Sequence, residues 1–224
     1  MMPKAVVLLS GGLDSSVNLG LAHQEHEVAL ALTFDYGQRA AKREIQATQN
    51  LCQHYSVPHK VLSLPWFKDF TSTGLVNPQA TIPTAGDVRI DDLDKSHKTA
   101  SQVWVPNRNG IFLNIAAAFA ESLGAEFVIP GFNAEEGATF PDNTWEFMQA
   151  TSAAFWFSTQ LKGKAGGHVS VKCYTHGWHK VEIVKKGQQI GVPLELVWSC
   201  YFDERCGQCE SCLRFERAIK EARP

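Results

Sequence analysis

Apolar residues follow two alternating patterns along this chain. Short runs rich in apolar residues predict strands at residues 4–10, 27–34, 59–64 and 126–131. Longer stretches with mixed apolar and polar positions predict helices at residues 14–25, 40–55, 109–124, 142–162 and 179–190, and a short one from about residue 210. Gly124 and Gly191 are typical helix ends, and we expect Asp142 to be the N-cap of the helix that follows it.

The order of these elements predicts the fold class. Strands that are apolar almost throughout are typical of parallel sheets with both faces covered. Their alternation with helices predicts an α/β fold, a Rossmann-like parallel sheet with helices on both faces. In such sheets ligands bind beyond the carboxyl ends of the strands. We therefore expect the functional site at residues 10–16, 33–37, from 64 onward and at 131–133.

Residues 65–106 interrupt this alternation. They contain Pro65, Gly74, Pro78, Pro83 and Gly86, and no sustained period of apolar positions. A segment of this length is typically a functional lid or contains short elements of its own. We expect a long mobile loop or lid here, inside an α/β domain of residues 1–195. Residues 196–224 then form a C-terminal subregion packed on that domain.

The amino-acid composition narrows the kinds of function that this protein can have. The chain has 224 residues, of which 44% are hydrophobic and 20% are charged, and its formal net charge is −2. This balance argues against a broad basic surface, so we expect no stable binding of nucleic acid. No apolar run reaches the length of a membrane span, and the first residues lack the basic and apolar regions of a signal peptide. The expectation is a cytoplasmic protein without a membrane partner.

The segment Ser-Gly-Gly-Leu-Asp-Ser-Ser at 10–16 joins the first strand to the first helix. Two glycines allow the backbone to approach a ligand closely, and a helix N-terminus attracts anions, so the segment suits a phosphate. It is neither a Walker A loop nor the Gly-x-Gly-x-x-Gly fingerprint. Asp14 either caps the helix or shares a magnesium ion with the phosphates. The segment resembles the pyrophosphate loop of the N-type ATP pyrophosphatases, which cleave ATP between the α and β phosphates.

Four of the six cysteines lie close together in the tail, at Cys200, Cys206, Cys209 and Cys212. Two overlapping Cys-x-x-Cys units suit tetrahedral thiolate coordination, and four thiolates close the site to water. The pattern predicts one structural zinc ion per chain. An iron–sulfur cluster is the alternative, because some tRNA-thiolating relatives of the pyrophosphate-loop class carry one, and the cysteines would then be catalytic.

Four further segments make the resemblance specific: residues 33–44, 105–121, 131–143 and 179–212. Together with the loop they resemble, in collinear order over nearly the whole chain, the family of 7-cyano-7-deazaguanine synthases. Two departures stand out. Asn107 replaces a glycine that is usual in the family, and Phe140-Pro141-Asp142-Asn143 replaces a Tyr-Pro-Asp-Cys stretch.

The resemblance implies a fold like that of the adenine nucleotide alpha hydrolases and an ATP-dependent ligase. Its partners would be ATP with Mg²⁺, ammonia and 7-carboxy-7-deazaguanine, in the pathway to queuosine and archaeosine. The carboxylate and then the amide intermediate would each be adenylated, and loss of AMP would give the nitrile. The apolar, aromatic helix around residues 145–157 suggests a homodimer.

The resemblance also implies roles for individual residues. It implies ATP binding by Leu9, Ser10, Gly11, Gly12, Leu13, Asp14, Ser15, Ser16, Val17, Asn18, Leu19, Thr33 and Asp35. It implies substrate binding by Arg108, Asn109, Asn133, Phe140 and Asp142. Asp14, Arg108 and Lys180 are the catalytic candidates. Asp35 can equally be a loop carboxylate, Lys180 a surface lysine, and Asp142 a helix cap as well as a substrate contact.

Three other functions stay open at the level of sequence. A tRNA-modifying enzyme that adenylates a base for thiolation would keep the fold and change the acceptor. A relative that attaches a deazapurine to a protein would keep the chemistry. A zinc-knuckle module that binds nucleic acid on an inert α/β scaffold would not be an enzyme, and the balanced charge counts against it.

Overall fold

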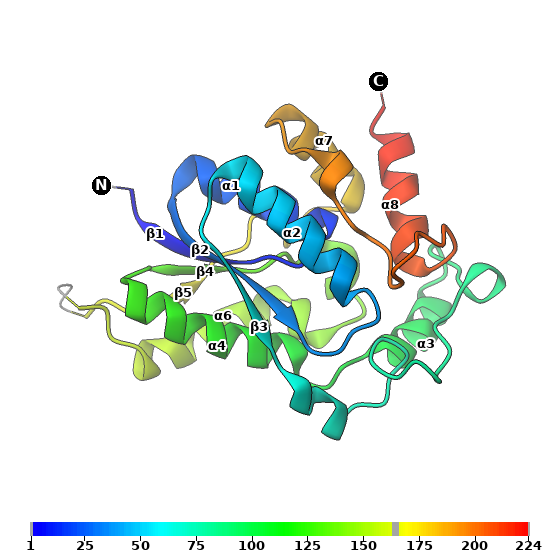
Figure 1. The fold of residues 1–224 in the computed structure, drawn as a ribbon, viewed down its shortest axis with the longest axis horizontal. Coiled ribbons are helices and arrows are strands. Elements are labelled where there is room, and N and C mark those ends of the chain that lie inside the picture. The colour runs from blue at the N-terminus through cyan, green and yellow to red at the C-terminus, as the bar shows by residue number, and fades with distance from the viewer. Residues whose placement is uncertain (1, 163–165, 224) are drawn as a thin grey trace.

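A five-stranded parallel sheet forms the centre of the molecule (Figure 1). The computed structural model describes residues 2–162 and 166–223. The strands are β1 (Lys4–Leu8), β2 (Glu27–Asp35), β3 (His59–Ser63), β4 (Phe127–Ile129) and β5 (Ser170–Val171), in the order β3-β2-β1-β4-β5. Every neighbouring pair is parallel. The predicted α/β fold with a parallel sheet is therefore confirmed.

Helices cover both faces of this sheet, α1 and α2 on one side and α4 and α6 on the other (Figure 1). Their bounds are α1 (Leu13–Glu25), α2 (Ala41–Tyr55), α4 (Arg108–Leu123) and α6 (Trp145–Ser158). Strand β1 illustrates how both faces of the sheet become buried, since successive side chains of a strand point to opposite faces. Ala5 and Val7 pack in the core under α1 and α2, whereas Val6 packs in the core under α4 and α6.

The remaining helices are α3 (Leu93–Val103), α5 (Ala134–Gly137), α7 (Lys180–Gln189) and α8 (Glu210–Glu221), with 3₁₀ turns at Pro65–Asp69, Ala85–Asp87, Pro141–Asn143 and Leu194–Leu196. Sequence patterns missed α5 and β5, because segments of four and two residues are too short to show a period. The predicted helix at 142–162 is shorter at both ends. Among the described residues, no helix has the length and apolar character needed to cross a membrane.

The segment 65–106, predicted to be a mobile loop or lid, contains the eleven-residue helix α3. This helix lies against the C-terminal part of the chain (Figure 1). Thr99 on α3 donates a hydrogen bond of 3.1 Å to the carboxylate of Glu210, and Arg214 on α8 donates one of 3.4 Å to Ser96. Polar contacts with a distant element therefore fix a segment whose own pattern predicted no helix.

The C-terminal helix α8 packs on the body of the protein. Phe215 and Ala218 on α8 share a buried apolar cluster with Val17 and Leu21 on α1 and with Ile183 on α7. Residues 196–224 therefore contribute to the core beside the sheet.

Candidate functional site

A cavity of about 260 Å³ opens at the carboxyl ends of β1, β2 and β4, where the fold class places a ligand. Segments far apart in the sequence form its wall. They are residues 8–15, 32–44, 103–112, 130–143 and 198–201, together with Lys180 and the start of α8. Residues 10–16 and 131–133 therefore meet at one edge, as the strand pattern predicted.

The loop between β1 and α1 has the geometry of an anion site. Gly11 has φ +81°, a conformation that favours glycine, and its carbonyl accepts a hydrogen bond of 2.8 Å from the backbone N–H of Trp198. Gly12 is the N-cap of α1 and offers no side chain to the first helical N–H groups. Those N–H groups are therefore open to an acceptor from a ligand.

Serine hydroxyls surround the same loop. The hydroxyls of Ser10 and Ser15 lie 3.1 Å apart, and the Ser16 hydroxyl donates to the Gly12 carbonyl over 2.7 Å. Ser10 and Ser15 both line the cavity.

Gly131, just after β4, fits against the first turn of α1. A Cβ atom at this position would lie 2.5 Å from the backbone nitrogen of Ser15 and 2.6 Å from its Cα. Since both neighbours are backbone atoms, a side chain can be accommodated only by moving the loop.

We expect Gly131→Ala to lower the free energy of unfolding by about 1–3 kcal/mol and to weaken ATP binding, because overpacking would displace the start of α1. Urea unfolding and calorimetric titration with ATP measure the two effects. Gly177→Ala is the control, since a Cβ there meets nothing within 4 Å. Equal behaviour of the two variants would contradict the close approach.

Lys180, the first residue of α7, is buried and paired with two carboxylates. Its Nζ donates 2.8 Å to Asp14 and 3.2 Å to Glu136, and both Lys180 and Asp14 are 8% exposed. Asn133 donates to the same Asp14 oxygen over 3.1 Å. Burial raises the pKa of Asp14, against the attraction of Lys180, while the two carboxylates outweigh burial and raise the pKa of Lys180. Lys180 is therefore a buried cation at the end of the phosphate loop.

Arg108 is the second cation of the cavity. It begins α4, and its guanidinium donates 3.1 Å to the hydroxyl of Tyr36. Burial would lower the pKa of Arg108, but Tyr36 and the Asp142 carboxylate raise it above its ordinary value. The side chain stays charged beside the cavity.

The departure at Asn107 has a backbone explanation. Asn107 is the N-cap of α4 and has φ +50° and ψ +30°, in the left-handed region. Asparagine is the residue other than glycine that enters this region most readily. An asparagine in place of the usual glycine therefore keeps the turn that presents Arg108.

Asp142 does not cap the helix that follows it, so that prediction is wrong. Thr144 is the N-cap of α6 and accepts from the N–H of Phe147, because a 3₁₀ turn separates Asp142 from the helix. Asp142 instead accepts a hydrogen bond of 3.2 Å from the backbone N–H of Asn109, in the first turn of α4. Its carboxylate thus joins the loop after β4 to the start of α4.

Two aromatic groups lie at opposite ends of the cavity wall. Phe34 stacks on Phe112 with ring centroids 4.1 Å apart, at the end of β2. Trp104 and Phe140 are parallel within 8° at a centroid distance of 5.7 Å, on the side of β4. All four residues line the cavity, and β1 with its loop lies between β2 and β4 in the sheet.

Several residues expected at the site lie just outside the cavity wall. The side chains of Val17 and Leu19 are in apolar cores, and Asn18 donates 2.6 Å to the hydroxyl of Thr175. Thr33 donates 2.8 Å to the carbonyl of Leu9, and Asp35 accepts from the N–H of Gly37. Their side chains hold the loop and the end of β2 in place.

Other cavity residues were given no role from the sequence, although Tyr36 lies within the expected range 33–37. They are Tyr36, Glu44, Trp104, Glu135, Glu136, Trp198, Tyr201, Glu210 and Arg214. Arg214 forms ion pairs of 2.6 Å with Glu135 and 2.8 Å with Glu210, so the tail closes one side of the cavity. Only the "DYGQ" segment at the end of β2 and the "AEEG" segment shortly after β4 carried a local signal, as polar residues near the carboxyl ends of strands.

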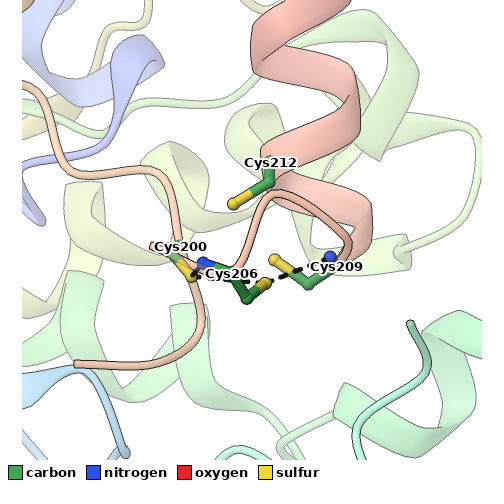
Figure 2. Close-up of side chains that lie close together, drawn as sticks. All are labelled: Cys200, Cys206, Cys209 and Cys212. Atoms are coloured by element: carbon green, nitrogen blue, oxygen red, sulfur yellow. Dashed lines mark hydrogen bonds between the residues drawn. The ribbon is translucent and has the colours of Figure 1, made fainter. Parts of the chain in front are cut away.

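The four tail cysteines form one cluster (Figure 2). Their Sγ atoms all lie within 4.8 Å of one another, and three of the four residues are buried. Backbone N–H groups of Gln208 and Cys209 donate to Cys206 Sγ over 3.4 and 3.3 Å, and Gly207 has φ +66° in the tight turn. Convergent sulfur atoms that accept N–H bonds fit a tetrahedral metal ion. The predicted metal ligands are therefore together.

Comparison with known proteins identifies the family. A family model described as Queuosine biosynthesis protein QueC matches residues 4–223. The chain is 56% identical to the 7-cyano-7-deazaguanine synthase of Bdellovibrio bacteriovorus over 98% of this chain and 94% of that one. It is 50% identical to the enzyme of the same name from Pelotomaculum thermopropionicum, over 98% and 97%.

Among solved structures, the U34-tRNA thiolase NcsA from Methanococcus maripaludis shares the fold at 16% identity and a TM-score of 0.50, with 98% of this chain and 65% of that chain covered. The full-length matches, the loop after β1 and the cysteine cluster agree. The chain belongs to the QueC family of queuosine biosynthesis proteins.

Proposed function

We propose that this chain converts 7-carboxy-7-deazaguanine, ammonia and ATP into 7-cyano-7-deazaguanine. One observation carries the proposal: in a member of the QueC family, the buried Lys180, the partly buried Arg108 and a phosphate-type loop line the same cavity. Each activation would proceed by attack of an oxygen of the acceptor on the α-phosphate of ATP.

The residues fit this chemistry. A carboxylate is a poor electrophile, because its oxygen is a poor leaving group, and adenylation converts that oxygen into part of AMP. Ammonia then displaces AMP to give the amide, and adenylation of the amide oxygen followed by loss of AMP gives the nitrile. Such steps depend on positioning and on neutralising phosphate charge, which Lys180 and Arg108 would provide.

ATP would bind with its phosphates on residues 10–16 and its nucleoside at the end of β2, near residues 33–36. Oδ1 of Asp14 is buried and has no hydrogen-bond partner within residues 2–162 and 166–223. A carboxylate oxygen of this kind suits magnesium, so Asp14 would hold the ion that accompanies ATP. The ion would neutralise phosphate charge.

The deazapurine would bind on the side of β4, opposite the nucleoside. Phe140 offers a ring for stacking, and Asp142 and Asn109 offer an acceptor and a donor for the edge of a guanine-like base. Asn133 is fully buried and holds Asp14, so it would act through that carboxylate. Phosphate chemistry would then occur between the two bases.

The cysteine cluster would hold one zinc ion with a structural role, because four thiolates leave no position for water. A homodimer would bury Trp156 and Phe157 on α6, which are 56% and 88% exposed in the single chain. Sedimentation equilibrium tests this, and a monomer at micromolar concentration would exclude it. The need for ATP and for reduced cysteines is consistent with the cytoplasm.

The test is mass spectrometry of an incubation with ATP, Mg²⁺, ammonium and 7-carboxy-7-deazaguanine. We expect loss of the carboxylate, appearance of the amide and then of the nitrile, and AMP formation that depends on the acceptor. ATP binding without AMP, and with the acceptor untouched, would mean that the substrate is wrong. tRNA and protein acceptors would then be tried with the same AMP measurement.

A further inference from the structure

The proposed reaction releases protons from nitrogen both when the amide forms and when the nitrile forms. Ammonia loses one N–H proton when it becomes the amide, and the amide loses two when it becomes the nitrile. None of the roles assigned above accepts a proton. A group inside the cavity that is partly ionised near neutral pH would serve both halves.

Carboxylates are the proton acceptors that line the cavity. Five of its six carboxylates already take part in ion pairs or hydrogen bonds on both oxygens or to a cation. Lys180 pairs with Asp14 and Glu136, Arg214 pairs with Glu135 and Glu210, and both oxygens of Asp142 accept hydrogen bonds, from Asn109 and Asn143. Glu44 differs from them. Within the described parts of the chain, its carboxylate has no cation in ion-pair range and accepts a single hydrogen bond, at Oε2.

Gln38 holds that carboxylate in place. Its side-chain nitrogen donates 2.7 Å to Glu44 Oε2 and 3.0 Å to the carbonyl of Phe34, while its oxygen accepts 2.9 Å from the N–H of Tyr36. Gln38 is buried, and its two bonds to the backbone of β2 and Tyr36 are buried with it, whereas its bond to Glu44 is partly buried. The end of β2 thus orients Glu44 and leaves Oε1 available.

Glu44 also lies beside the phosphate loop. It occupies the first turn of α2, and this turn packs against Gly11 so closely that a Cβ there would be 3.2 Å from the Glu44 carbonyl and 3.0 Å from Ala47 Cβ. Both Glu44 and the loop line the cavity. A base at this position is next to the place where phosphate and acceptor must meet.

We propose that Glu44 is the proton acceptor for the amine steps of the reaction and that Gln38 is its positioning residue. In the first half, the nitrogen of ammonia forms a bond to the activated carbonyl carbon, its proton passes to Glu44, and AMP leaves with the C–O electron pair. In the second half, Glu44 has returned its first proton to solvent, one N–H proton leaves to solvent as the amide oxygen is adenylated, and the remaining N–H proton passes to Glu44 as the C≡N bond forms and AMP leaves with the C–O electron pair. This inference rests on the proposed function.

The charges around Glu44 suit this task. Burial raises the pKa of Glu44 to about 7, while the hydrogen bond from Gln38 and the charge of Arg108 on α4 lower it and Asp35 on β2 raises it. Tyr36 is the other titratable group that faces it, and burial raises the pKa of that phenol, so it stays neutral. At a constant concentration of free ammonia, the rate should therefore rise with pH up to about 7 and then level off, because the ionised form is the base.

The variant E44Q tests the proposal, because it keeps the shape and removes the base. We expect acceptor-dependent exchange between pyrophosphate and ATP, which reports adenylation alone, to stay within about threefold of wild type. Formation of the amide at fixed ammonium should fall by about 100-fold or more at pH 7.

Glu44→Asp retains a carboxylate and should recover part of the amide rate, and Gln46→Ala is the control on the exposed face of α2. The proposal is overturned if E44Q makes amide at the wild-type rate, or if exchange falls with amide formation in both Glu44 variants. Absence of exchange in the wild-type protein would contradict the proposed function itself, whatever the variants do.

Discussion

Replacing Lys180 by methionine is expected to lower the free energy of unfolding by about 3–5 kcal/mol and nitrile synthesis by about 100-fold or more. The methionine fills the space of the lysine stem but leaves the Asp14 and Glu136 carboxylates facing each other without a cation. Without Lys180, burial raises the pKa of Asp14 further, and the pKa of Glu136, which Lys180 helps to lower, rises as well. Urea unfolding and the mass-spectrometric assay measure the two losses.

The pH dependence of the Lys180 variant has a definite sign. Acids whose pKa is raised in the folded state bind more protons folded than unfolded, so they lower stability as pH rises. K180M should therefore be closer to wild type near about pH 5 than near about pH 8. Asp14→Asn combined with K180M should recover part of the stability lost in K180M alone, since it removes one of the unpaired carboxylates.

Lys172→Met is the matched control. It breaks an ion pair of 2.9 Å with Glu25 that is largely exposed, and a change of less than about 1 kcal/mol is expected. If K180M and K172M destabilise equally, the buried pair between Lys180 and Asp14 does not exist in solution.

Replacing Cys209 by serine is expected to remove the bound metal and to destabilise the C-terminal part of the protein. Cys209 is fully buried, and its backbone forms an isolated antiparallel β-bridge with Thr84, in the segment that leads to α3. Structural zinc ions contribute on the order of 10 kcal/mol to folding in small zinc-binding peptides, so loss of the ion should melt this region. Elemental analysis and proteolysis between residues 84 and 103 measure both effects.

Gln208→Ala, in the same turn but without a thiol, is the control and should keep one metal ion per chain. Zinc at about one equivalent in the wild type supports the structural role. Iron with acid-labile sulfide in place of zinc would favour a cluster instead. A C209S protein that keeps its zinc and resists the protease would contradict the role of this cysteine.

Local patterns were enough for the main elements of the fold. Apolar runs determined β1 and β2, and the long apolar period determined α4, because these segments are buried by any arrangement that covers the sheet. The segment at 10–16 and the cysteine spacing also located the loop that lines the cavity and the four cysteines that converge. In both cases the residues that act together are neighbours in the chain.

The helix α3 illustrates where patterns failed. Residues 93–103 are rich in polar residues, and the contacts that fix them, such as those between Thr99 and Glu210, join positions far apart in the sequence. The predicted helix cap at Asp142 was wrong for a related reason. Its residue type suits a helix cap, but Asp142 lies within the 3₁₀ turn Pro141–Asn143, and its carboxylate accepts from Asn109 instead.

The sequence by itself thus determined the α/β class, the phosphate loop, the cysteine cluster and the family resemblance, since each is written in adjacent or regularly spaced residues. Only the tertiary structure decided which charges meet. Lys180 lies 166 positions from Asp14, and Glu44 is left, among the described residues, without a cation within ion-pair distance, because Arg214 and Lys180 reach the other carboxylates. Such pairings depend on how distant elements pack, and no local period of the chain encodes them.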